Sequence, residues 1–257
     1  MHPSPLVHRV TDTEWQAVDD DGHVIGHGDV SHRPDGRRFL SIDVWRDTAF
    51  SPLAAAMSAA LPAPLHALVG EADSGPDSRW RQAGYAFSRR EVEYRLPTAP
   101  DAAAPLTVSL PAGFTVLPGT GADEELVRGL DRALREEIDA AVGWHTMPAE
   151  VIPRPAGTVL GDPARYAVAV ADDGAYVGLV RVAVVPRRAR IGLVAVLAGA
   201  RRRGVGRALL AHALGSLHAA GLPSATAEVD ASNLAGTALV EGFGARRVDS
   251  VVELIRH

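Results

Sequence analysis

Residues 201–210 constrain the fold of this chain more than any other segment. The stretch before them, residues 191–197, is short, apolar and bounded by small residues, which favours a buried strand. After the loop, apolar residues recur at helical spacing over residues 205–217, until Gly221 ends the pattern. The segment therefore predicts a strand, a tight loop with two glycines, and a helix that begins at that loop.

The predicted loop has the chemistry of a phosphate site. The first N–H groups of a helix lack intrahelical acceptors, and the helix dipole favours negative charge there. Gly204 and Gly206 carry no Cβ, so an anion can approach the backbone closely. Arg201, Arg202 and Arg203 add guanidinium groups, which bind phosphate oxygens through paired hydrogen bonds. A basic, solvated turn is the alternative interpretation, because short motifs also match by chance.

Two common phosphate-binding motifs are excluded. A dinucleotide-binding fingerprint requires a glycine three residues after Gly206, where this chain has Leu209. A Walker A loop requires a lysine, and the chain contains none.

The segment resembles the acetyl-coenzyme A site of the GCN5-related N-acetyltransferase (GNAT) superfamily. Arg201, Gly204 and Gly206 meet the family pattern Arg/Gln-x-x-Gly-x-Gly/Ala after a strand. The resemblance covers residues 106–257 and is strongest over residues 193–245.

The resemblance implies which residues bind the cofactor, acetyl-coenzyme A (acetyl-CoA). They lie at the end of the strand, in the glycine loop, in the first helical turn, and at the asparagine that follows the next predicted strand. In the family this asparagine contacts the pantetheine, and a backbone N–H near Val196 or Leu197 stabilises the developing oxyanion. The implied cofactor-binding residues are Val194, Val196, Leu197, Arg201, Arg202, Arg203, Gly204, Val205, Gly206, Arg207, Ala208 and Asn233.

The chain departs from the family at the positions that carry proton transfer. Val240 replaces the tyrosine that protonates the leaving thiolate in many members, although a thiol with a pKa of about 8.5 leaves tolerably without a donor. The cofactor strand carries no carboxylate, so Glu228 and Asp230, which share one face of the next predicted strand, are weak candidates for the general base. The alternative is that they are solvated carboxylates or partners of nearby arginines.

Three residues are candidates for binding the acceptor amine. An amphipathic helix is predicted over residues 126–138, and its acidic face, which includes Glu137, suits a cationic amine. A merely solvated helix face is the alternative. Trp144 and His145 follow in an expected loop, where they either line an acceptor pocket or fill a crevice between the two halves of the chain.

The chain shows an apparent duplication. Residues 18–26 echo residues 170–178, each with an Asp-Gly turn between two predicted strands. We therefore predict an α/β fold of two tandem acetyltransferase-like domains, each with a mixed, mostly antiparallel sheet flanked by helices. Their predicted bounds are residues 1–97 and 106–257, joined by a proline- and alanine-rich linker over residues 98–105.

The first domain is predicted to be degenerate. Where the second copy has arginines and paired glycines, residues 45–52 contain no glycine, and Asp47 would repel phosphate. We expect this half not to hold the cofactor.

The composition excludes several classes of protein. A net charge of −5 argues against a general nucleic-acid binder, and the absence of cysteine excludes disulfides and thiolate chemistry. No histidine spacing indicates a metal site. No run is apolar and long enough for a membrane span, and the first residues do not form a signal peptide, so a cytoplasmic protein with no membrane partner is expected. A monomer and a homodimer both remain open.

Two functions are consistent with these features. The favoured one is an acetyl-CoA-dependent N-acetyltransferase, in which a primary amine of a small molecule or peptide attacks the thioester directly. The alternative is a non-catalytic acyl-CoA sensor or scaffold with the same fold.

Overall fold

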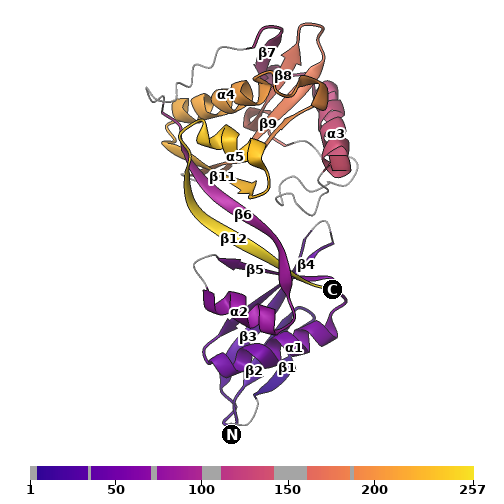
Figure 1. Cartoon of the computed structure of the whole chain (residues 1–257), viewed down its shortest axis with the longest axis vertical. Coiled ribbons are helices and arrows are strands. Elements are labelled where there is room, and N and C mark those ends of the chain that lie inside the picture. The colour runs from indigo at the N-terminus through magenta and orange to yellow at the C-terminus, as the bar shows by residue number, and fades with distance from the viewer. Residues whose placement is uncertain (1–4, 34–35, 71–73, 100–110, 142–160, 186–187) are drawn as a thin grey trace. The chain divides into compact units, whose positions relative to one another are not determined.

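The computed structural model divides the chain into two compact units (Figure 1). The N-terminal unit comprises Met1–Glu91 together with Asp249–His257, and the C-terminal unit comprises Val92–Val248. The residues that the structure describes are 5–33, 36–70, 74–99, 111–141, 161–185 and 188–257.

The N-terminal unit is a mixed sheet with strand order β1-β2-β3-β4-β5-β12-β6. Its β4 and β5 are parallel, whereas β1–β2, β2–β3, β3–β4 and β5–β12 are antiparallel. The elements are β1 (Leu6–Arg9), β2 (Glu14–Val18), β3 (Val24–His32), β4 (Arg38–Val44), η1 (Asp47–Ala49), α1 (Phe50–Ala60), β5 (Leu65–Gly70), α2 (Ser74–Gln82), the first half of β6 (Ala86–Pro97) and most of β12 (Arg246–Arg256).

Alternation along the strands separates two faces of this sheet. One face packs on α1 and α2 and contains fully buried side chains such as Trp15, Leu53 and Leu254. On β12, the neighbouring Glu253 points to the other face and is also buried. It accepts hydrogen bonds there from His66 of β5 and Arg89 of β6.

The C-terminal unit has strand order β6-β11-β10-β9-β8-β7. β10 and β11 are parallel, and β7–β8, β8–β9 and β9–β10 are antiparallel, so the predicted mixed, mostly antiparallel sheet is confirmed. Its further elements are β7 (Phe114–Pro118), η2 (Gly119–Gly121), α3 (Glu124–Ala141), η5 (Pro163–Arg165), β8 (Tyr166–Ala171), β9 (Tyr176–Val185), β10 (Arg188–Val196), η6 (Ala198–Ala200), α4 (Val205–Ala219), β11 (Ser224–Asp230) and α5 (Leu234–Glu241).

Helices cover both faces of this sheet. On one face, α4 and α5 enclose the larger core, in which Leu209, Leu210 and Leu214 of α4 are fully buried. On the other face, α3 packs through Val127, Leu130 and Leu134. The predicted amphipathic helix over residues 126–138 is thus the central part of α3.

The two units repeat one order of elements, as the duplication predicts. The series β2-β3-β4-η1-α1-β5-α2-β6 matches the series β8-β9-β10-η6-α4-β11-α5-β12. Each series has one parallel pairing at the same place, between Arg38–Leu40 and Leu65–Ala67 in the first copy and between Ala189–Ile191 and Ala225–Ala227 in the second.

The bounds of the units differ from those predicted at the end of each half. Residues Val251–Arg256 of β12 pair with β5, so the C-terminal segment belongs to the N-terminal unit. Conversely, the second half of β6 belongs to the C-terminal unit. Thr98, in the predicted linker, is buried and donates its N–H to the carbonyl of Pro223 at 3.2 Å, whereas linker residues 100–105 lie outside the described residues.

No helix in the described part of the chain has both the length and the apolar character that crossing a bilayer requires.

Candidate functional site

The predicted cofactor strand separates from its neighbour where the site begins. β10 pairs with β11 over Ala189–Ile191 and Ala225–Ala227, whereas its pairing with β9 continues from Arg188 to Val196. The register with β9 shifts between Ile191 and Leu193, and such a bulge bends a strand. The backbone at the C-terminal end of β10, beyond Ile191, therefore faces an opening on the side of β11.

One backbone donor at this opening can be identified. The N–H of Leu197 donates to the carbonyl of Val177 at 2.9 Å, so it points toward β9. N–H groups alternate in direction along a strand, and that of Val196 therefore faces away from β9, into the opening. Of the two residues named for the oxyanion donor, the geometry favours Val196.

The loop that follows has the backbone conformation of an anion-binding turn. Arg202 and Gly204 have positive φ angles of 63° and 88°, and α4 begins at the next residue, Val205. No side chain caps this end of α4. Among the described residues, the first N–H groups of the helix thus receive no side-chain cap from the N-cap residue, Gly204.

Gly206 leaves the first turn of α4 open. A Cβ added there would lie 3.7 Å from Val196 and 4.0 Å from both Val194 and Leu239, which are ordinary contacts. Packing within the protein therefore does not require a glycine at this position. A cradle of backbone N–H groups with this open approach fits the diphosphate of coenzyme A, and the adjoining strand opening fits its pantetheine arm.

The loop arginines differ in their contacts. Arg201 donates from Nε to the carbonyl of Val196 at 2.8 Å, and Arg203 and Arg207 lie over aromatic rings. Arg202 is exposed at the tip of the loop. Arg203 and Arg207 each lie two positions from Val205, the first residue of α4, and Arg202 lies three positions from it.

Glu137 connects α3 to this loop. Its two carboxylate oxygens accept the N–H of Ala198 at 3.1 and 3.0 Å, and one of them also accepts Nη2 of Arg201 at 2.6 Å. Sequence analysis places Glu137 in the acceptor site, whereas the structure shows it bound to the turn after β10. No local signal could indicate this contact, because the two segments are 61 positions apart.

Both candidate general bases have protein partners. Glu228 accepts a hydrogen bond from Arg190 of the adjacent β10. Asp230 accepts the backbone N–H and the hydroxyl of Ser232 at 2.9 and 2.6 Å, which fixes the turn before α5. Glu228 is thus the partner of an arginine and Asp230 forms a turn, and a general-base role for either carboxylate stays a prediction.

The remaining predicted residues have separate places. Asn233 caps α5, with its Oδ1 accepting the N–H of Gly236 at 2.9 Å, so its amide nitrogen remains as a donor. Val240 of α5 is 6% exposed and packs into the core that α4 and α5 cover. Trp144 and His145 lie outside the described residues.

The equivalent loop of the N-terminal unit is different, as predicted from its sequence. Its helix α1 follows Ala49 rather than a glycine, and Asp47, the first residue of η1, pairs with Arg79 at 2.9 Å. η1 is followed directly by α1, whereas residues 201–204 form a loop between η6 and α4 in the other unit.

Comparison with known proteins gives a family match for part of the chain and structural relatives for nearly all of it. Residues 131–245 match the model of the Acetyltransferase (GNAT) family. The chain is similar in structure to a GCN5-related N-acetyltransferase from Sphaerobacter thermophilus, with a TM-score of 0.69 and 20% identity over 97% of this chain and 82% of the other. Comparison with curated protein sequences finds no match.

A second structural relative shares the duplicated architecture. It is a tandem GNAT protein from the clavulanic acid biosynthesis pathway, solved without AcCoA, with a TM-score of 0.62 and 19% identity over 100% of this chain and 84% of the other. Residues 131–245 thus form a GNAT acetyltransferase domain. The whole chain has the fold of GNAT acetyltransferases in their tandem arrangement.

Proposed function

We propose that this protein is an acetyl-CoA-dependent N-acetyltransferase that acts on a primary amine of a small molecule or peptide. The separation of β10 from β11 beside the open glycine loop carries this proposal. It offers one continuous backbone surface for an extended thioester arm and its diphosphate.

The residues of the site then have defined tasks. The N–H groups of Val205, Gly206 and Arg207 hold the diphosphate, with Arg202 and Arg203 as charged partners. The backbone of Val194 and Val196 and the side-chain amide of Asn233 align the pantetheine. Acetyl-CoA supplies an activated acetyl thioester.

Proton transfer depends little on side chains in this proposal. The N–H of Val196 donates to the acetyl oxygen as negative charge grows there, a role that needs no particular side chain. Val240 offers no proton to the departing sulfur, which leaves as a thiolate. Glu228 and Asp230 are engaged in other bonds, so the amine attacks in its neutral form, and the proton that its nitrogen loses on amide formation passes to solvent.

A non-catalytic acyl-CoA sensor or scaffold is the second candidate. One observation favours it. Among the described residues near the loop, Val240 stands in place of a proton-donating tyrosine, and the candidate bases Glu228 and Asp230 both have hydrogen-bond partners. Trp144 and His145 stay proposed acceptor residues under the first function.

The test is release of free thiol from acetyl-CoA in the presence of a panel of primary amines. The enzyme proposal predicts amine-dependent thiol release that is lost in Gly206→Glu, which places a bulky anion in the open first turn. Gly215→Glu is the matched control, because it lies on the same helix in open space and should retain activity. Tight acetyl-CoA binding with no thiol release for any amine would instead support the sensor.

A further inference from the structure

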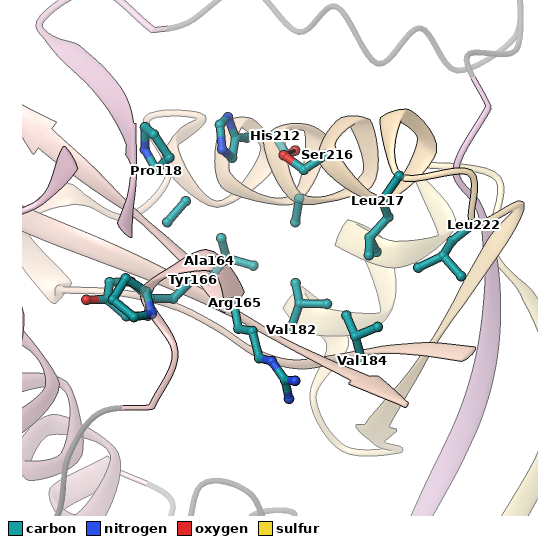
Figure 2. A pocket seen from close by; sticks show the side chains of 15 residues that line it. Pro118, Ala164, Arg165, Tyr166, Val182, Val184, His212, Ser216, Leu217 and Leu222 are labelled. Carbon is teal, nitrogen blue, oxygen red and sulfur yellow. Dashed lines mark hydrogen bonds between the residues drawn. The ribbon is translucent and has the colours of Figure 1, made fainter. Parts of the chain in front are cut away.

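A cavity lies under the C-terminal half of α4, within the C-terminal unit (Figure 2). Its volume is about 200 Å³. β8 and β9 form its floor, α4 forms its roof, and the residues around η5 form part of its rim.

The cavity exists because small side chains on α4 face valines on β9. Ala213, Ser216 and Ala220 follow helical spacing and so share one side of α4. Opposite them, Val182 and Val184 point up from β9. Larger residues on that side of the helix would fill the space, so the void is encoded in the sequence of α4.

Its size is suited to a small ring. Well-packed protein interiors contain few voids larger than a water molecule. An apolar cavity of about 150 Å³ in an engineered protein stays dry and binds benzene. The cavity under α4 is somewhat larger and has a mostly apolar lining, so it accommodates a ring system of about six to nine heavy atoms.

One polar side chain gives the cavity a specific partner group. His212 lies on the α4 wall next to Ser216 (Figure 2), and burial lowers the pKa of its imidazole, which keeps the ring neutral at neutral pH. A neutral imidazole offers one donor and one acceptor nitrogen. Within the described part of the chain, no hydrogen bond is made to this ring, whereas the Ser216 hydroxyl already donates to the His212 carbonyl at 2.9 Å.

The charged groups near the cavity argue against a charged occupant. Arg165 lies at the rim, is exposed, and has Asp162 at 3.5 Å as its partner. The Tyr166 phenol keeps its proton, because burial raises its pKa. An ion buried among these valines and alanines would lose its hydration without a matching charge.

We propose that this cavity binds a small, uncharged ring compound with one hydroxyl or N–H group, of the phenol or indole class. The apolar ring lies against Val182 and Val184, and its polar group hydrogen-bonds to the imidazole of His212. The site is separate from the glycine loop, since Gly206 and Ala213 are about 10 Å apart along α4. It therefore stands independently of acetyl transfer.

The first test is calorimetric titration of the full chain with phenol and with indole. We expect saturable binding by the wild type that is weakened at least tenfold in Ala213→Leu, which fills the cavity. Ala219→Leu makes the same change at an exposed position of α4 outside the lining and should bind as the wild type does. Absence of saturable binding of both probes by the wild type, or equal binding by Ala213→Leu, would overturn the proposal.

Two further measurements test the chemistry of the site. His212→Phe should weaken phenol binding about three- to tenfold, as expected for the loss of a neutral hydrogen bond, and leave benzene binding unchanged. Benzoate should bind more weakly than phenol; tighter binding of benzoate would contradict an uncharged ligand and point to Arg165. Thermal unfolding of Ala213→Leu checks the space itself, because a lowered melting temperature would mean overpacking and no cavity to fill.

Discussion

Glu253 of β12 joins the C-terminal segment to the N-terminal unit through one imidazole and two guanidinium side chains. Its side chain is 3% exposed, and its two oxygens lie 2.7 Å from Nδ1 of His66 and from Nε of Arg89. Nη1 of Arg37 lies 3.3 Å from Oε1 of Glu253. Burial alone would raise the pKa of Glu253, but these hydrogen bonds and the positive charges of Arg89 and Arg37 outweigh burial and lower it.

Glu253→Gln keeps the shape of the side chain and removes its charge. Breaking a buried ion pair on one side destabilises a protein by about 3–5 kcal/mol, because the other charge remains buried. Arg89 retains Glu91 at 2.8 Å, so we expect the lower end, about 3 kcal/mol. For a chain of this size that corresponds to a fall in melting temperature of about 6–12 °C.

The pH dependence has a defined sign. A carboxyl whose pKa is lowered on folding stabilises the native state fully above the unfolded pKa, about 4.3 for glutamate, and loses this contribution as the pH falls through the lower folded value. The difference in stability between the wild type and Glu253→Gln should therefore be constant near neutral pH and become smaller below about pH 4.

Differential scanning calorimetry measures this difference. Asp249→Asn is the matched control, since it removes an exposed carboxylate from the same strand and should shift the melting temperature by less than about 1 °C. A shift for Glu253→Gln no larger than that of the control would refute the reasoning that this cluster holds the C-terminal strand in the N-terminal unit.

Four further outcomes follow from the site. Glu137→Ala should lower the melting temperature by about 2–4 °C, because it removes the hydrogen bonds to Ala198 and Arg201. A third of the Glu137 side chain is exposed, so solvent screening limits the loss of stability to about 1 kcal/mol. The control Glu136→Ala should leave the melting temperature unchanged. Asn233→Asp should preserve the cap of α5, and therefore stability, but weaken acetyl-CoA binding through loss of the amide donor; unchanged affinity would exclude the pantetheine contact. Arg46→Ala, in the equivalent loop of the N-terminal unit, should leave acetyl-CoA binding unchanged in a titration. Because Glu228 and Asp230 are engaged in other bonds, thiol release should rise about tenfold per pH unit between about pH 6.5 and 8.5 with an alkylamine of pKa about 10.4, and a plateau in that range would reveal a titrating protein base.

The strand, glycine loop and helix over residues 191–219 could be predicted from the sequence because their signals are local. A branched apolar strand, two glycines and an amphipathic helix follow one another within residues 191–217, and β10, the loop and α4 occupy those positions. The duplicated order of elements could also be predicted from local signals, because each Asp-Gly turn and its flanking strands are contiguous in the chain.

The contacts that could not be predicted join distant segments. The sequence of Val251–Arg256 does not indicate which strand it pairs with, and only the fold shows that its partner is β5 in the N-terminal half. Glu137 looks like one of several acidic residues on a solvated helix, and only the fold brings it to Ala198 and Arg201. Glu228 was ambiguous in the sequence because its partner, Arg190, lies on a different strand.

Direct binding of acetyl-CoA tests the central claim. At a ligand concentration of 100 times the dissociation constant, binding stabilises the native state by about 2.7 kcal/mol, which thermal unfolding resolves as an upward shift in melting temperature. The account predicts a saturable shift in the wild type and in Gly215→Glu, and its loss in Gly206→Glu. No shift at millimolar acetyl-CoA, or an equal shift in Gly206→Glu, would contradict the assignment of the loop before α4 as the cofactor site.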